Sequence, residues 1–260
     1  MATPRWTRAL VTGASSGIGA AFARRLAAGR TDLVLVARRG DRLTAMAAEL
    51  EVDVEVVPAD LSRPDQRRSV EARLSGDERP IDLLVNSAGI GMVGSFHEVD
   101  ADELESQIEL NVVAVVRVTH AGFTAMRRRG KGAIVVVSSL AALQPLPKHA
   151  VYAATKAFVT SLSDALVEEA RGTGVSITNV MPGFVDTEFV GRAATDEQTQ
   201  RLPGFLWMSA DAVAAAGLAA AAKGDPNCVP GLGYKAFAVA TAPAPRWLKR
   251  WGAGVATRAF

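Results

Sequence analysis

The sequence predicts an α/β protein in which a parallel β-sheet is covered by helices on both faces, giving a three-layer, doubly wound architecture in a single domain. Short runs of Val, Leu and Ile alternate along the chain with stretches that have helical periodicity. The apolar runs are continuous, as in strands that are buried on both faces of a parallel sheet. A glycine-rich turn joins the first apolar run to the first amphipathic stretch, as in a β-α-β unit.

The first half of the chain alternates regularly between strands and helices. Ile18, Phe22 and Leu26 recur at a spacing of four and mark the buried face of the first helix. In chain order, we expect a strand at 9–13, a helix at 17–28, a strand at 33–36, a helix at 41–50, a strand at 52–57, a helix at 63–74 and a strand at 81–85.

The second half continues the alternation and then becomes less regular. We expect a long helix at 102–129 closed by Gly130, a strand at 133–137, a helix at 151–171, a strand at 175–180, and an alanine-rich helix at 212–222 between a Ser209 N-cap and Gly224. Residues 186–208 have a mixed pattern and are predicted to form a substrate lid. Residues 1–225 would form the domain, and 226–260 a C-terminal extension that packs on it or on a partner.

The composition excludes several classes of protein. Of 260 residues, 49% are hydrophobic and 22% are charged, which excludes a disordered chain. The net charge of +2 does not suggest a nucleic-acid partner. The single cysteine cannot form an internal disulfide and fits a reducing compartment, and the three histidines lack the spacing of a metal site. We therefore expect no bound metal. Because the sequence shows neither a membrane-spanning run nor a secretory signal, we expect a soluble cytoplasmic protein.

The turn after the first strand has the features of a phosphate-binding loop. Its glycines would let the backbone approach a pyrophosphate at a helix N-terminus; a purely structural turn is the alternative. The residues expected to contact the cofactor here are Gly13, Ser15, Ser16, Gly17, Ile18 and Gly19.

The spacing of these glycines, Gly-x3-Gly-x-Gly, resembles the first motif of the short-chain dehydrogenase/reductase family. Further matches extend the resemblance over roughly residues 7–190. It implies a Rossmann-type fold and an oxidoreductase that transfers hydride between a nicotinamide cofactor and a ketone, aldehyde or alcohol.

The end of the second strand points to NADP(H). An NAD site usually has an acid there, whereas an arginine accommodates the 2′-phosphate of NADP. This chain has Ala37-Arg38-Arg39, with no acid before Asp41. We expect Arg38 to bind the phosphate; a solvated basic turn is the alternative.

The resemblance implies three further cofactor segments. Asp60 and Leu61 would contact the adenine, although Asp60 would equally suit a helix cap. The segment Asn86, Ala88 and Gly89 departs from the usual Asn-Asn-Ala-Gly by having Ser87. The segment Pro182, Gly183, Val185 and Thr187 would lie under the nicotinamide, although Pro-Gly alone is only a turn.

Four residues match the catalytic set of the family: Asn111, Ser139, Tyr152 and Lys156. Tyr-x3-Lys alone is uninformative, but it places a phenol and an ammonium on one helix face. We expect Tyr152 to protonate the alkoxide that hydride transfer leaves, with the Lys156 ammonium lowering the pKa of the phenol. By resemblance, Ser139 would donate to the carbonyl oxygen and Asn111 would fix a water. Tyr152 and Lys156 would also contact the cofactor, Lys156 by holding the nicotinamide ribose.

Phe184, Phe205 and Trp207 suggest an apolar substrate mouth. The 226–260 extension carries five Lys and Arg and no acid, so it would pack on the domain or a subunit, or lie on an anionic membrane surface. A homodimer or homotetramer is implied by resemblance. Two other functions stay open: a redox-silent NADP(H)-binding regulator, and a peripheral membrane module that uses the fold as a scaffold.

Overall fold

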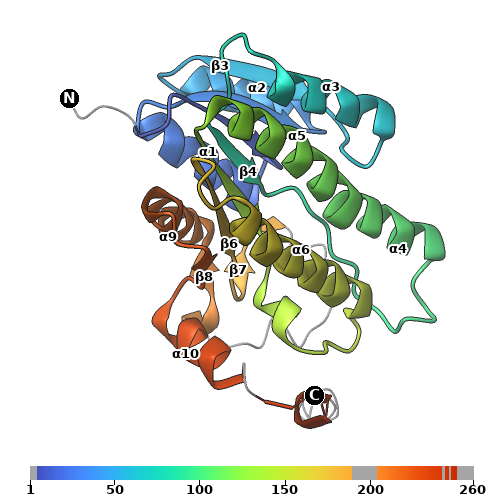
Figure 1. Ribbon diagram of the computed structural model, residues 1–260. Coiled ribbons are helices and arrows are strands. Elements are labelled where there is room, and N and C mark those ends of the chain that lie inside the picture. The colour runs from blue at the N-terminus through green and yellow to red at the C-terminus, as the bar shows by residue number, and fades with distance from the viewer. Residues whose placement is uncertain (1–4, 189–203, 242–243, 246, 251–260) are drawn as a thin grey trace.

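The computed structural model describes residues 5–188, 204–241, 244–245 and 247–250. Its main element is a seven-stranded parallel sheet with the strand order β3-β2-β1-β4-β5-β6-β9 (Figure 1). The strands are β1 (Arg8–Thr12), β2 (Asp32–Ala37), β3 (Val54–Pro58), β4 (Leu83–Asn86), β5 (Gly132–Val137), β6 (Val175–Val180), β7 (Val185–Asp186), β8 (Met208–Ser209) and β9 (Asn227–Cys228). The helices are α1 (Gly17–Ala28), α2 (Gly40–Glu49), α3 (Pro64–Ser75), α4 (Ala101–Ile108), η1 (Glu109–Val113), α5 (Ala114–Arg129), η2 (Leu140–Leu143), α6 (Ala150–Glu169), η3 (Gly204–Leu206), α9 (Ala210–Lys223) and α10 (Leu232–Thr241).

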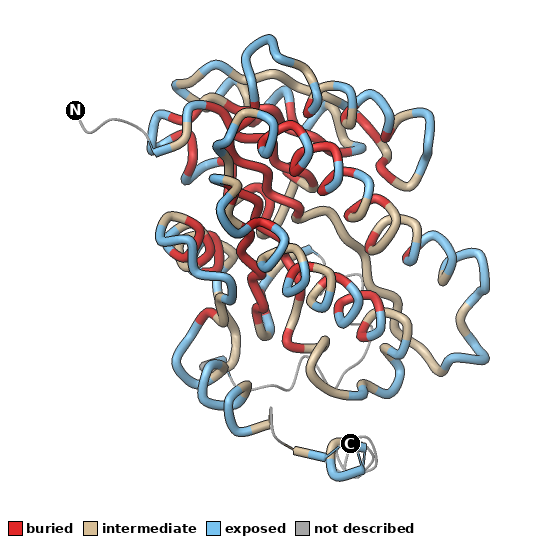
Figure 2. Tube along the Cα trace, in the orientation of Figure 1, coloured by how far each residue is buried: buried red, intermediate tan, exposed pale blue. Residues whose placement is uncertain are grey.

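Helices cover both faces of this sheet, which confirms the doubly wound α/β prediction. One apolar core joins the sheet to α1, α2 and α9, and a second joins its other face to α3, α5 and α6. The central strands lie between the two layers of helices and are buried along their length (Figure 2). Continuous apolar runs form these strands because neither face meets water.

The strand order reverses at β1, which pairs with β2 on one side and β4 on the other. In an open α/β sheet, a ligand crevice lies at this switch point, outside the carboxyl ends of the strands. The glycine loop, the segment after β4 and the segment after β5 all begin at this edge.

The long helix predicted at 102–129 is interrupted, which the sequence did not suggest. A π-helical turn, η1, separates α4 from α5. A π-turn contains one residue more than an α-helical turn. The apolar periodicity continues through it, so the sequence pattern does not reveal this additional residue. Asn111 lies within η1, and π-turns are frequent at functional sites.

The region between β6 and α9 contains a second, small sheet in which β7 pairs with β8. The predicted lid at 186–208 therefore begins and ends in short strands, and its residues 189–203 lie outside the described part of the chain. The predicted Ser209 cap is confirmed, because its hydroxyl accepts a hydrogen bond of 3.1 Å from Ala212 N.

The predicted boundary at 225/226 falls just before a strand of the main sheet. β9 pairs with β6, so the first residues of the extension complete the sheet. α10 follows and has no buried residue. Among the described residues, no helix is long and apolar enough to cross a membrane.

Candidate active site

The glycine loop is packed too closely for side chains. Gly13 has a φ of +67°, and a Cβ there would lie 2.9 Å from the backbone of Ala88. A Cβ on Gly19 would lie 2.4 Å from the carbonyl oxygen of Gly13. Ser16 caps α1 without a side-chain hydrogen bond to its first N–H groups. The loop therefore fits the close approach of a pyrophosphate to the first turn of α1.

Arg39, rather than Arg38, contacts this loop. Its guanidinium donates to the hydroxyl of Ser15 at 3.2 Å and to that of Ser16 at 2.8 Å, whereas Arg38 is exposed. Arg39 was not among the residues predicted to bind the phosphate, although it follows Gly19 by 20 residues. Dinucleotide folds place the residue that recognises the 2′ position at this offset.

Thr12 fixes the loop after β4 against the glycine loop. Its hydroxyl oxygen accepts hydrogen bonds from Ser87 N at 3.0 Å and Ala88 N at 3.1 Å. The buried Asn86 donates through Nδ2 to the hydroxyl of Thr119 at 2.8 Å. The hydrogen bond of Ser87 is made by its backbone N–H and does not depend on its side chain. The loop therefore stays anchored although serine replaces the usual asparagine.

Asp60 and Leu61 lie at the carboxyl end of β3. The Asp60 carboxylate accepts hydrogen bonds from the backbone N and the hydroxyl of Ser62, at 3.0 and 2.6 Å. Leu61 is buried in the core beneath α3 and α5. Asp60 therefore closes a local turn onto Ser62 and does not cap α3, whose N-cap is Arg63. Its contact with adenine stays a prediction.

Ser139, Tyr152 and Lys156 come together where β5 ends and α6 begins. Ser139 is hydrogen-bonded to Tyr152, and Lys156 Nζ lies 5.8 Å from the centroid of the Tyr152 ring. Lys156 donates to the carbonyl oxygen of Val137 at 2.9 Å. The neighbouring Ser138 is turned away and donates to the backbone oxygen of Lys156 at 3.0 Å. The geometry therefore favours Ser139 over Ser138 as the reacting serine.

Asn111 connects this group to the loop after β4. It is buried, accepts from Ile90 N at 2.9 Å, and donates to Ile90 O at 2.8 Å and to the Thr155 hydroxyl at 3.1 Å. One helical turn earlier, the buried Gln107 accepts from Met92 N at 2.8 Å. Gln107 was not predicted from the sequence, where its spacing of four from Asn111 is the signal that would point to it.

The electrostatics differ from the sequence-based expectation. Burial raises the pKa of Tyr152 to about 12, although the hydrogen bond with Ser139 acts to lower it. Burial lowers the pKa of Lys156 to about 8. The expected lowering of the tyrosine pKa by the ammonium is thus not observed, because desolvation is the larger effect.

Aromatic side chains lie beside the segment after β6. The rings of Phe184 and Trp207 have their centroids 5.8 Å apart. The hydroxyl of Tyr234, on α10, accepts from Phe184 N at 3.1 Å and donates to Leu206 O at 2.5 Å. Tyr234 had not been predicted, and the side chain of Phe205 lies outside the described residues.

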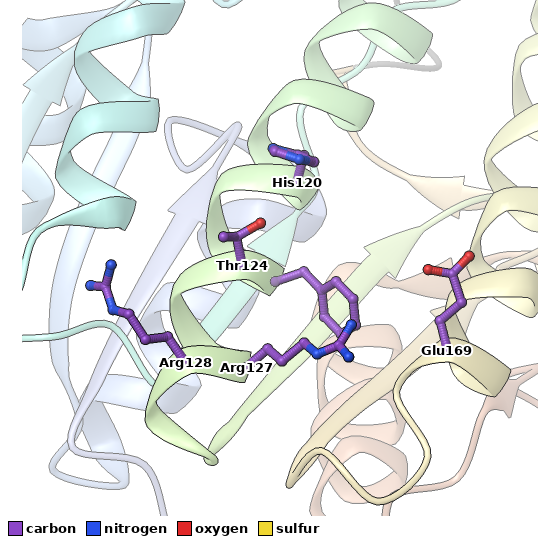
Figure 3. Close-up of a pocket in the computed structure, with 6 residues that line it drawn as sticks. His120, Thr124, Arg127, Arg128 and Glu169 are labelled. Carbon is purple, nitrogen blue, oxygen red and sulfur yellow. The ribbon is translucent and has the colours of Figure 1, made fainter.

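A surface hollow between α5 and α6 lies away from these groups. Figure 3 shows His120, Thr124, Arg127 and Arg128 on α5 and Glu169 on α6 around it. Arg127 is 16 residues beyond Asn111, roughly 24 Å along a helix. The hollow is therefore not part of the candidate active site.

A family model described as short chain dehydrogenase matches residues 7–198. The chain belongs to the short-chain dehydrogenase family. Sulfoacetaldehyde reductase 2 of Chromohalobacter salexigens is 39% identical over 184 residues, which cover 69% of this chain and 73% of that protein. This short-chain dehydrogenase is therefore an oxidoreductase that interconverts carbonyl and alcohol groups, as the sequence analysis predicted.

Solved structures of short-chain dehydrogenases have the same fold as this chain. A short-chain dehydrogenase from Sphingobium yanoikuyae in complex with NADPH has a TM-score of 0.82 and 38% identity, with 90% of this chain and 91% of that one covered. The bulky-bulky ketone specific alcohol dehydrogenase from Comamonas testosteroni has a TM-score of 0.76 and 32% identity, with 87% and 86% covered.

Proposed function

We propose that this short-chain dehydrogenase reduces a bulky, largely apolar ketone or aldehyde with NADPH, or oxidises the corresponding alcohol with NADP⁺. The assembly of Ser139, Tyr152, Lys156 and Asn111 beside an aromatic mouth carries the proposal. Serine, tyrosine and lysine there supply a hydrogen-bond donor, an acid and a cation within one group of side chains.

NADP(H) is the cofactor that the residues fit. The closely packed Gly13 and Gly19 leave a cradle that a Cβ would fill. Arg38 and Arg39 stand at the end of β2, where an acid would favour NAD. The Sphingobium relative was solved with NADPH. Val185 and Thr187 are the residues we assign to the nicotinamide carboxamide.

When bound, the cofactor supplies or accepts the hydride, and the side chains manage the proton and the charge. In reduction, Tyr152 donates its phenolic proton to the carbonyl oxygen of the substrate. Ser139 donates a hydrogen bond to the same oxygen and stabilises its developing negative charge. The Lys156 ammonium stabilises the phenolate that remains, and Asn111 holds the loop at Ile90 beside it.

The aromatic residues beside the segment after β6 support the proposed substrate class. Phe184 and Trp207 present apolar rings, and Tyr234 holds the backbones of Phe184 and Leu206 together. The Comamonas relative is specific for bulky-bulky ketones. An aromatic mouth of this kind favours a bulky apolar carbonyl compound over a small anionic aldehyde.

The remaining assignments concern assembly and location. We place the protein in the cytoplasm as a homodimer or homotetramer that associates through α5 and α6. α10 bears the exposed Leu232 and Val239, and Trp247 is exposed beyond it. We assign this extension to packing on the domain or a subunit; liposome co-sedimentation with and without residues 227–260 tests the alternative membrane contact.

The decisive experiment is Tyr152→Phe, measured by NADPH oxidation with a panel of bulky ketones. Loss of a general acid should lower kcat by at least about a hundredfold, while the Kd for NADPH stays near that of the wild type. Ser139→Ala should lower kcat more than its matched control, Ser138→Ala. Unchanged turnover in Tyr152→Phe would remove the proposed mechanism and favour a redox-silent regulator.

A further inference from the structure

The carboxylate of Glu188 is held by two arginines. Its Oε2 lies 2.8 Å from a terminal nitrogen of Arg39, and its Oε1 lies 2.6 Å from one of Arg42. Arg39 uses its other nitrogens on the hydroxyls of Ser15 and Ser16. The carboxylate thus completes the set of acceptors around this guanidinium.

Glu188 is placed over the glycine loop by its neighbour in the chain. The side chain of Thr187 lies within 3.2 Å of the position that a Cβ on Gly17 would take. Arg39 and Arg42 lie at the end of β2 and in the first turn of α2, where a 2′-phosphate is recognised. A protein carboxylate therefore lies where the dinucleotide fold binds an anion.

We propose that Glu188 is a specificity-determining residue, whose carboxylate occupies on Arg39 and Arg42 the position that the 2′-phosphate of NADP(H) takes. This inference rests on the proposed use of NADP(H). Phosphate and carboxylate compete for the same guanidinium groups, so Glu188 weakens NADPH binding selectively. NADH has no 2′-phosphate and leaves the two ion pairs intact.

The charges make this exchange feasible. The hydrogen bonds from Arg39 and Arg42 lower the pKa of Glu188 to about 2, so its carboxylate stays ionised around neutral pH. Both ion pairs are partly exposed, and such pairs are individually weak. A phosphate monoester carries up to two negative charges near neutral pH and offers more acceptor oxygens than a carboxylate. It is therefore able to displace Glu188.

The test is Glu188→Gln, titrated with NADPH and NADH by tryptophan fluorescence. From the usual strength of exposed ion pairs, the ratio of Kd for NADH to Kd for NADPH should rise about fivefold. Adenosine 2′,5′-bisphosphate should gain affinity similarly, and AMP should not. The matched control, Asp186→Asn, removes a negative charge two residues away and leaves both ion pairs in place, so it should shift the two Kd values together.

A mutant cycle with Arg39 makes the test specific. If Glu188 acts through this guanidinium, Glu188→Gln should change the ratio much less in an Arg39→Gln background. An unchanged or lower ratio in Glu188→Gln alone would refute the competition. Failure of the wild type to bind NADPH would instead refute the proposed cofactor, which separates the two results.

Discussion

Lys156→Met should make the protein more stable near neutral pH, although it removes a residue that we assign to catalysis. The Lys156 side chain is buried, with 8% of the residue exposed, and its hydrogen bond to Val137 O is 2.9 Å long. Burial lowers its pKa from 10.5 to about 8. The folded state therefore disfavours the ammonium that the unfolded state carries freely.

The size of the effect follows from this difference in pKa. Each pKa unit corresponds to 1.36 kcal/mol, so holding the ammonium in the fold destabilises it by about 3 kcal/mol below pH 8. Methionine has a similar length and no charge, but it leaves Val137 O without its donor, which costs about 1 kcal/mol. Lys156→Met should therefore raise the free energy of unfolding by about 2 kcal/mol near pH 7.

The pH dependence distinguishes this cause from altered packing. Between the folded pKa of about 8 and the unfolded value of 10.5, the unfolded state binds more protons, so the stability of the wild type rises with pH. The variant lacks this contribution. The raised pKa of Tyr152, about 12 against 10.0, acts oppositely but only above pH 10.

Urea unfolding of both proteins without cofactor is the assay. Between about pH 7 and about pH 9.5, the stability advantage of Lys156→Met should shrink by about 2 kcal/mol. The reason is that pH 9.5 lies about 1.5 pH units above the folded pKa of Lys156, and each unit corresponds to about 1.36 kcal/mol. An advantage that does not change with pH, or a variant that is less stable at pH 7, would refute the argument from desolvation.

Three other substitutions test the loop, the linking asparagine and the mouth. Gly19→Ala would bring a Cβ to 2.4 Å from Gly13 O, and should lower NADPH affinity more than about tenfold in the same fluorescence titration. Asn111→Leu leaves the N–H and C=O of Ile90 without this partner and removes the hydrogen bond that the Thr155 hydroxyl accepts, although that hydroxyl still donates to Tyr152 O. The free energy of unfolding should fall by roughly 2 to 3 kcal/mol; an unchanged urea midpoint would contradict this. Tyr234→Phe removes the hydrogen bonds to Phe184 N and Leu206 O, and should raise KM for a bulky ketone about fivefold with little change in kcat; a fall confined to kcat would contradict its place at the mouth.

The sequence alone predicted the elements whose causes are local. Continuous apolar runs marked the central strands because both faces of the sheet are covered. Ser209 and Gly224 marked the limits of α9 because capping depends on neighbouring residues. The spacing of Ser139, Tyr152 and Lys156 predicted one reacting group because it matches the family pattern. In the structure, Ser139 follows the end of β5, and Tyr152 and Lys156 lie in the first turns of α6.

The features that were missed depend on contacts between distant parts of the chain. Arg39 and Glu188 are separated by 149 positions, and no local pattern pairs them. The choice between Arg38 and Arg39 depends on which side chain faces the glycine loop at the end of β2. The raised pKa of Tyr152 was missed for a related reason: proximity in sequence suggested the ammonium as the main influence, whereas the surrounding fold determines desolvation.

The ion pair between Arg39 and Glu188 and the raised pKa of Tyr152 both bear on how the site would respond to its cofactor. The surroundings of Tyr152 and Lys156 favour the neutral forms of both side chains, and Glu188 supplies a negative charge at Arg39. We propose that a dinucleotide with a 2′-phosphate would bring its own anion to Arg39, and that its ribose hydroxyls would add polar partners for Lys156 to its hydrogen bond with Val137 O. Such partners favour the ammonium, and the ammonium in turn favours the phenolate of Tyr152. The pKa of Tyr152 should therefore fall when the cofactor binds.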